Sequence, residues 1–132
     1  MDIDAFLDGS PFAVVGASAS RAKYGNKVLR AYLQNGLKAL PVNPNETEVE
    51  GLRAYDDLMS LPEQPHGISI ITQPHVTERI VEDAAALGIA HVWMQPGAES
   101  DDAVENAKAH GMNVIFGGPC LLVRLGFSER GG

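Results

Sequence analysis

Residues 12–26 constrain the possible folds of this 132-residue chain more than any other stretch. The stretch begins with the short apolar run Phe12–Val15, turns at Gly16, passes through a small polar loop, and ends where a helix is expected to begin. A short apolar run before a turn is typical of a strand that is covered on both faces. Gly16 permits a tight turn and a close approach of backbone N–H groups to a ligand. The order of strand, glycine turn and helix therefore predicts an α/β unit.

The polar loop after Gly16 carries groups that suit an anion. Ser18 and Ser20 supply hydroxyl donors, while Arg21 and Lys23 supply positive charge. The free N–H groups and the positive dipole end of the following helix would face whatever lies in the loop, and phosphate is the natural ligand. Because a glycine after a buried strand also occurs in many α/β turns that bind nothing, the hypothesis depends on the two cations and on a parallel sheet.

The remaining sequence alternates between strand and helix patterns. A short lead-in with one helical turn precedes the first strand, and an apolar tail at residues 121–127 ends the pattern. We expect further strands at residues 38–42, within 48–55, and at 67–72, 90–94 and 113–116, with main helices at 26–35, 74–87 and 101–110. Such alternation implies right-handed crossovers and an α/β fold of three layers, in which helices cover both faces of a mainly parallel sheet of five to six strands. At this length, residues 1–132 are expected to form a single domain.

Ligands of such sheets bind at the carboxyl ends of the strands, where the strand order reverses. The segments expected to leave those ends are rich in Gly, Pro, Asn, Gln and Ser, and poor in acid–base groups. We find no nucleophile–base pair, no paired carboxylates and no metal-ligand spacing among the four histidines, so we assign no catalytic and no metal-binding residues. The segments are residues 16–24, 43–45, 72–75, 95–97 and 117–120.

Charge and cysteine content narrow the class of partners. The formal net charge of −7 argues against non-specific binding to nucleic acid or to anionic membranes. No apolar run reaches membrane-spanning length. The one cysteine excludes an intrachain disulfide and fits a reducing compartment, so a cytoplasmic location is expected.

Two features count against a dinucleotide such as NAD. The usual fingerprint has paired glycines after the first strand and a carboxylate after the second strand for the ribose hydroxyls. Here Gly16-Ala-Ser18 replaces the paired glycines, and Gly25 comes nine residues after Gly16. The second strand ends in Val42-Asn43-Pro44, without a carboxylate at that point.

Several short motifs together resemble the CoA-binding domain family, the small stand-alone proteins similar to the N-terminal domain of the succinyl-CoA synthetase α subunit. The resemblance covers about residues 8–125 and implies a Rossmann-like fold with strand order 3-2-1-4-5 and CoA across the carboxyl edge of the sheet. The motifs are Val15-Gly-Ala-Ser18, Tyr24-Gly-Asn26, Pro41-Val-Asn-Pro44, Val49-Glu-Gly51, and Val92-Trp-Met-Gln95 with Gly97.

The resemblance also implies positions for the parts of coenzyme A. The diphosphate would lie against Gly16, Ala17, Ser18 and Ser20, and the adenosine part beside Val42, Asn43 and Pro44. The groove would continue along Ile71, Thr72, Gln73 and Pro74, with Gln95 and Gly97 near the pantetheine end. Arg21 and Lys23 fit phosphate neutralisation on the residue pattern alone.

The chain departs from the resembled family in three places. The synthetase subunits often carry a lysine just after the second strand, suited to the CoA 3′-phosphate, whereas Asn45-Glu46 stand here, so that Arg21, Lys23 or Arg53 would have to substitute. Many stand-alone members read Asp-Arg-Cys near the last strand, where this chain has Gly118-Pro119-Cys120. The chain also lacks the second domain that carries the synthetase phosphohistidine, so ligase activity does not carry over.

These features favour a cytoplasmic binding protein for CoA or an acyl-CoA without catalysis of its own. Three alternatives stay open: a thiol- or acyl-transfer enzyme that uses Cys120, an NAD(H)-binding redox sensor, and a scaffold with a vestigial pocket. The apolar tail at residues 121–127 could cover the core or contact another subunit in a homo-oligomer.

Overall fold

Five parallel strands form the central sheet of the computed structural model, which describes residues 1–130. The strand order is β2-β1-β5-β6-β7, and β3 and β4 form a separate antiparallel pair. The elements in chain order are α1 (Ile3–Leu7), β1 (Phe12–Val15), α2 (Tyr24–Gln34), β2 (Ala39–Val42), β3 (Glu48–Val49), β4 (Leu52–Arg53), the 3-10 helix η1 (Leu58–Ser60), β5 (Gly67–Ile70), α3 (Pro74–Leu87), β6 (His91–Met94), α4 (Asp101–Ala109), β7 (Asn113–Ile115) and α5 (Leu121–Arg124).

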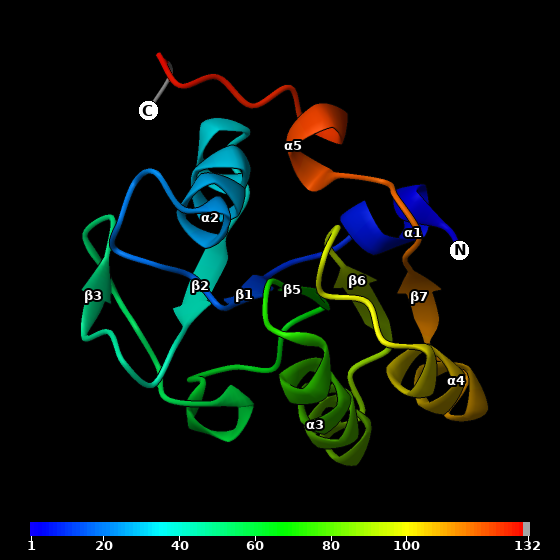
Figure 1. Cartoon of the computed structure of the whole chain (residues 1–132). Coiled ribbons are helices and arrows are strands. Elements are labelled where there is room, and N and C mark those ends of the chain that lie inside the picture. Colours follow the sequence, from blue (N-terminus) through cyan, green and yellow to red (C-terminus); the bar gives the residue numbers. More distant parts are fainter. Residues whose placement is uncertain (131–132) are drawn as a thin grey trace.

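Helices cover both faces of this sheet. In the view of Figure 1, α2 and α5 lie above the sheet, and α3 and α4 lie below it. This arrangement confirms the predicted Rossmann-like α/β fold with its three layers. Within residues 1–130, no helix combines the length and the apolar character needed to cross a membrane.

The strands are buried on both faces because alternate side chains enter two separate cores. In β1, Ala13 and Val15 pack on the side of α3 and α4, whereas Phe12 and Val14 pack on the side of α2. Phe12 stacks on Tyr32 of α2, with ring centroids 4.8 Å apart, and Trp93 of β6 is completely buried beside Phe6 of α1. The apolar tail packs into this second core through Leu121, so the expectation that it returns to the body is confirmed.

The third predicted strand differs from expectation. Residues 48–55 form the β3–β4 hairpin, because Glu50 and Gly51 both have positive φ and reverse the chain. Only Tyr55 reaches the main sheet, through a single parallel bridge to Val42. The predicted order 2-1-4-5 is therefore found in β2-β1-β5-β6, while β7, predicted as the sixth strand, adds the far edge.

Pro41 lies on β2, the edge strand of the main sheet, where a missing N–H donor is tolerated. Its carbonyl oxygen still accepts from the Tyr55 N–H at 3.0 Å, and the Asn43 N–H donates to the Tyr55 carbonyl at 2.8 Å. Pairing beyond β2 is thus limited to Tyr55, in keeping with the incomplete pairing expected there. The two bonds place the chain after Tyr55 at the same edge of the sheet as the chain after Val42.

One hydrogen bond ties α2 to the centre of the sheet. The Tyr32 and Ser69 hydroxyls are 2.6 Å apart, and both residues are completely buried. Burial raises the pKa of Tyr32 far above its ordinary value, so the phenol remains neutral and able to donate. Each hydroxyl is the partner that makes burial of the other tolerable.

Replacing Tyr32 with Phe should lower the free energy of unfolding by about 1–2 kcal/mol, because the buried Ser69 hydroxyl loses its partner. Urea denaturation monitored by circular dichroism measures this change. The double variant Tyr32→Phe/Ser69→Ala, which removes both polar groups, should recover part of the loss. A Tyr32→Phe protein as stable as the unmodified chain would contradict the proposed role of this bond.

Candidate functional site

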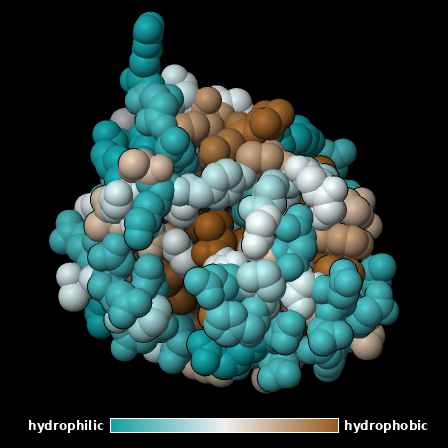
Figure 2. Space-filling model, in the orientation of Figure 1, coloured by the Kyte–Doolittle hydropathy of each residue, from teal (hydrophilic) through white to brown (hydrophobic). Residues whose placement is uncertain are grey.

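A cavity of about 1090 Å³ lies at the carboxyl ends of β1, β2 and β5. In Figure 2 the surface is hollowed near the centre, with hydrophobic atoms at the bottom and hydrophilic atoms around the rim. This is the edge where the strand order reverses between β1 and its two neighbours. The lining residues are Val15, Gly16, Ser18, Lys23, Tyr24, Gly25, Val42, Asn43, Pro44, Asn45, Glu46, Asp56, Asp57, Ile71, Thr72, Gln73, Val76, Arg79, Ile80 and Asp83.

Gly16 is required at the cavity by close packing of the backbone. Its φ is +100°, and a Cβ atom there would lie 2.0 Å from the Ile71 carbonyl oxygen. Its N–H donates to the Val42 carbonyl at 2.9 Å, so this N–H is already engaged by the protein. Gly25 is equally constrained, because its Cβ would lie 2.0 Å from the Gly16 carbonyl oxygen. The two glycines let α2 begin directly against the ends of β1 and β5.

Asn26 shapes the loop between β1 and α2 from inside. This completely buried side chain donates from Nδ2 to the Ser18 carbonyl at 2.8 Å and to Glu50 at 3.0 Å. Its Oδ1 accepts from Arg30 Nε at 2.6 Å. The hydrogen bond from Asn26, together with the charge of Arg21, holds the pKa of Glu50 below its ordinary value. One amide thus joins the loop, the β3–β4 turn and α2.

Asn43 and Arg30 hold two further carbonyl groups of the same loop. Asn43 Nδ2 donates to the Ala17 carbonyl at 2.8 Å, and Arg30 donates to the Arg21 carbonyl at 3.0 Å. With carbonyl groups turned inward to these donors, the loop is held in one shape. Sequence reasoning assigned no role to Asn26 or Glu50, although the motifs Tyr24-Gly-Asn26 and Val49-Glu-Gly51 contained the signal.

The N-terminus of α2 opens onto the cavity. The helix begins at Tyr24, two residues earlier than predicted, and Lys23 in the N-cap position makes no side-chain capping bond. Lys23, Tyr24 and Gly25 all line the cavity. The positive end of an eleven-residue helix and one lysine therefore favour a negative charge at this place.

Most residues predicted for the site lie around this cavity, and the others do not line it. The lining set contains Gly16, Ser18, Lys23, Val42, Asn43, Pro44, Ile71, Thr72 and Gln73. The predicted residues outside the lining set are Ala17, Ser20, Arg21, Pro74, Gln95 and Gly97. Ala17 is completely buried, and the Arg21 guanidinium pairs with Glu50 at 3.2 Å. Of the two loop cations, Lys23 is thus the one that lines the cavity.

Sequence reasoning missed one wall of the cavity, which the first turns of α3 provide. Val76 and Ile80 were assigned to the core, and Arg79 and Asp83 to nothing, yet all four line the cavity. Their spacing is that of a single helix face that begins where the strand ends, and this signal could have identified them. The lining as a whole carries two cations, Lys23 and Arg79, against the four carboxylates of Glu46, Asp56, Asp57 and Asp83.

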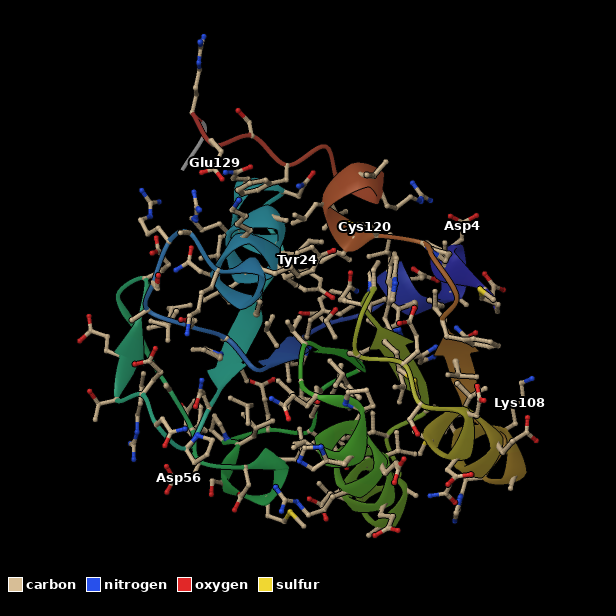
Figure 3. The ribbon with its side chains drawn as sticks, viewed as in Figure 1. Asp4, Tyr24, Asp56, Lys108, Cys120 and Glu129 are labelled. Carbon is tan, nitrogen blue, oxygen red and sulfur yellow. The ribbon has the colours of Figure 1, made fainter. Side chains whose placement is uncertain are left out.

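Gln95 lies behind the cavity wall with Tyr24 and Cys120. Gln95 is completely buried, and its Oε1 accepts from the Tyr24 hydroxyl at 3.2 Å and from the Leu121 N–H at 3.0 Å. Its Nε2 has no hydrogen-bond partner in the part of the chain that the structure describes. The Tyr24 hydroxyl is also 2.6 Å from Cys120 Sγ, and Figure 3 shows these two residues beside each other. Burial, with the contact to Cys120, raises the pKa of Tyr24 well above its ordinary value.

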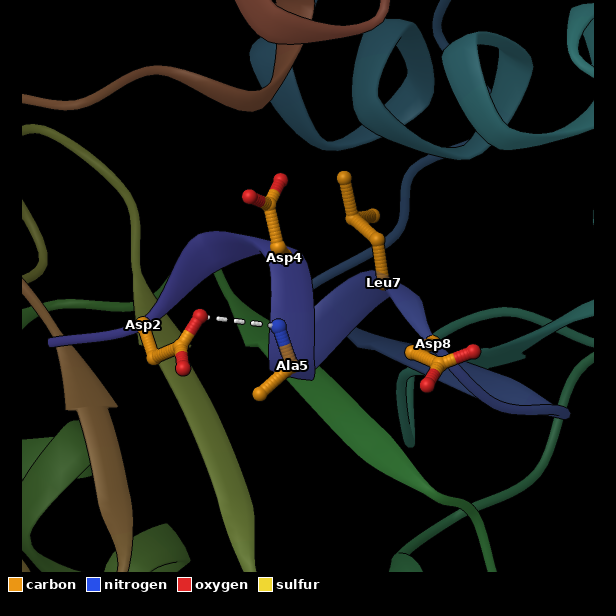
Figure 4. Close-up of a pocket in the computed structure, with 5 residues that line it drawn as sticks. All are labelled: Asp2, Asp4, Ala5, Leu7 and Asp8. Atoms are coloured by element: carbon orange, nitrogen blue, oxygen red, sulfur yellow. Dashed lines mark hydrogen bonds between the residues drawn. The ribbon is translucent and has the colours of Figure 1, made fainter.

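A second hollow, of about 580 Å³, lies beside α1 at the opposite edge of the sheet (Figure 4). It is lined by Asp2, Asp4, Ala5, Leu7 and Asp8. Asp2 accepts from the Ala5 N–H at 2.9 Å and caps the short helix. Three carboxylates around an open hollow repel an anionic ligand, so the candidate site is the cavity at the carboxyl edge.

The fold and the cavity together define a doubly wound α/β domain with an anion-suited loop at its switch point. The family model described as "CoA binding domain" matches residues 10–126. The chain therefore belongs to the CoA-binding domain family, as its sequence motifs indicated.

Three relatives illustrate the family. The chain is 27% identical over 124 residues to the acetate–CoA ligase (ADP-forming) II subunit alpha of Pyrococcus furiosus, covering 86% of this chain and 27% of that protein. It is 30% identical to acetate–CoA ligase (ADP-forming) II of Archaeoglobus fulgidus, over 80% of this chain and 17% of the relative. A conserved hypothetical protein from P. furiosus has a solved structure with a TM-score of 0.81 and 38% identity, covering 86% of this chain and 97% of that one. The chain thus spans only a minor part of the two ligases but nearly all of the small protein.

Replacing Asn26 with Ala should loosen residues 17–23, because the Ser18 carbonyl, Glu50 and Arg30 each lose a partner. We expect a loss of about 1–3 kcal/mol in unfolding free energy and faster amide hydrogen exchange in this loop. Asn106→Ala, on α4 and away from the cavity, is the matched control. Unchanged exchange in residues 17–23 would show that Asn26 does not hold the loop.

Proposed function

We propose that this chain, as one domain of residues 1–132, binds CoA or an acyl-CoA at the carboxyl edge of its sheet and catalyses no reaction by itself. The observation that carries the proposal is the cavity in which the α2 N-terminus and Lys23 meet the ends of β1, β2 and β5. Membership of the CoA-binding domain family supports the class of ligand. The lone cysteine supports a cytoplasmic location.

The chemistry of the lining fits the parts of such a ligand. The uncapped end of α2, Lys23 and the Ser18 hydroxyl would hold the diphosphate. Val42, Asn43 and Pro44 would flank the adenosine part. The groove from Ile71 to Gln73 would carry the ligand onward, with Val76 and Ile80 as its apolar wall. Ala17, Ser20 and Arg21 would act through the shape of the loop, because they do not line the cavity.

Binding without catalysis is supported by the groups around the cavity. None of the described residues that line it is a histidine or a cysteine. The two ligases named above are several times longer than this chain, as the covered shares of 27% and 17% state. When bound, CoA itself would supply a thiol that carries acyl groups.

CoA at millimolar concentration should raise the melting temperature of the protein, since a ligand that binds only the folded state stabilises it. Ser18→Glu should abolish the shift, because it sets a carboxylate against the phosphates. Ala109→Glu, on the exposed end of α4, adds the same charge elsewhere and should leave the shift unchanged.

Differential scanning fluorimetry with CoA, and with NADH as the competing nucleotide, measures these effects. The absence of a shift with CoA would refute the proposed function. A larger shift with NADH would favour the redox-sensor alternative. A full CoA shift in Ser18→Glu would refute the placement of the diphosphate.

Thiol exchange at Cys120 is the second candidate function, and one contact favours it. Cys120 Sγ lies 2.6 Å from the hydroxyl of Tyr24, which lines the cavity. In such an exchange, the Cys120 thiolate would attack CoA disulfide, form a protein–CoA mixed disulfide and release one CoA thiolate.

Intact-protein mass spectrometry after incubation with CoA disulfide, without reductant, separates this candidate from binding alone. We expect an unmodified mass, because burial and the Tyr24 contact shield the thiol. A CoA adduct that disappears in Cys120→Ser would instead establish the thiol function.

A further inference from the structure

Glu46, which follows β2, already makes contact with the anion-suited loop. Its Oε2 accepts a hydrogen bond of 2.5 Å from the Ala19 N–H, so a carboxylate of the protein uses a backbone donor of this loop. Glu46 also lines the cavity, and its Oε1 has no protein partner among residues 1–130. The position after β2 is therefore occupied by a fixed acceptor with one oxygen still available.

Two further carboxylates line the cavity from the same side. The bridge between Tyr55 and Val42 brings Asp56 and Asp57 to the edge at which β2 ends, and both line the cavity. The only lining cations among the described residues, Lys23 and Arg79, come from the start of α2 and from α3. Negative charge thus collects beside the end of β2, where a Rossmann-like fold binds the adenosine ribose.

The cations that could have compensated for Glu46 are directed elsewhere. Arg21 pairs with Glu50 at 3.2 Å, and the guanidinium of Arg53 lies over the Tyr55 ring at 5.4 Å. Neither residue lines the cavity. The end of β2 therefore presents acceptors for hydrogen-bond donors and no cation of its own for a phosphate.

The charge at this place decides which ribose can bind. A carboxylate after the second strand accepts hydrogen bonds from free ribose hydroxyls, whereas a ribose phosphate needs a cation there. A phosphomonoester beside Glu46, Asp56 and Asp57 would meet like charge, which selects against the phosphorylated ligand.

We propose that the cavity takes an adenosine 5′-diphosphate derivative whose ribose carries no phosphate, of the dephospho-CoA type, and that Glu46 is the residue that determines this specificity. This inference rests on the proposed function, since it concerns the adenosine end of a CoA-type ligand at the same edge. It reverses the expectation that a loop cation replaces the missing lysine for the 3′-phosphate.

Isothermal titration calorimetry with CoA and with dephospho-CoA tests the inference, because the two ligands differ only in the 3′-phosphate. The unmodified protein should bind dephospho-CoA about tenfold more tightly than CoA. Glu46→Gln should reduce this preference, and Glu46→Lys should reverse it. Glu48→Lys makes the same charge change on the exposed β3, outside the cavity lining, and should leave the preference intact.

The outcomes separate the inference from the proposed function. If CoA binds as tightly as dephospho-CoA or more tightly, or if Glu46→Lys keeps the original preference, the inference is wrong and CoA-type binding stands. If the unmodified protein binds neither ligand, the proposed function fails and the inference fails with it. Should Glu46→Lys not fold, Glu46→Gln provides the comparison, and an unchanged preference in that variant overturns the role of Glu46.

Discussion

The candidate site depends on the close approach of three backbone segments at Gly16. The end of β1, the residue after β5 and the start of α2 meet there, and a Cβ atom on Gly16 or on Gly25 would lie 2.0 Å from a carbonyl oxygen. No side chain fits at such a distance, so any substitution must push the strands or the helix apart. This contact fixes where α2 begins and therefore where its positive end opens.

A set of buried polar side chains then holds the loop in one shape. Asn26, Asn43 and Arg30 hold the carbonyl groups of Ser18, Ala17 and Arg21. Because these donors come from α2 and from the end of β2, the loop can move only if the layers move with it. A cavity of this kind is largely formed before the ligand arrives, which reduces the ordering that binding requires.

The sequence predicted the fold and the ligand edge well because both depend on local patterns. Apolar runs before glycine or proline marked β1, β5 and β6, and the helical spacing marked α3 and α4. The pattern could not separate the β3–β4 hairpin from a strand of the sheet, because the reversal depends on the positive φ of Glu50, an uncommon conformation for a residue other than glycine. It also could not show that Arg21 pairs with Glu50, nor that Glu46 reaches Ala19 across 27 positions of the chain, since side-chain partners distant in sequence appear only in the folded chain.

The most direct test of the account is a nuclear magnetic resonance titration of the ¹⁵N-labelled protein with CoA and with dephospho-CoA. The account predicts that backbone amide signals shift in three segments, residues 16–25, 43–46 and 71–73, which surround the cavity. Signals of residues 2–8, beside the acidic hollow at the opposite edge, should stay in place. Shifts confined to residues 2–8, or no shift with either compound, would contradict the claim that the carboxyl edge of this sheet binds a CoA-type ligand.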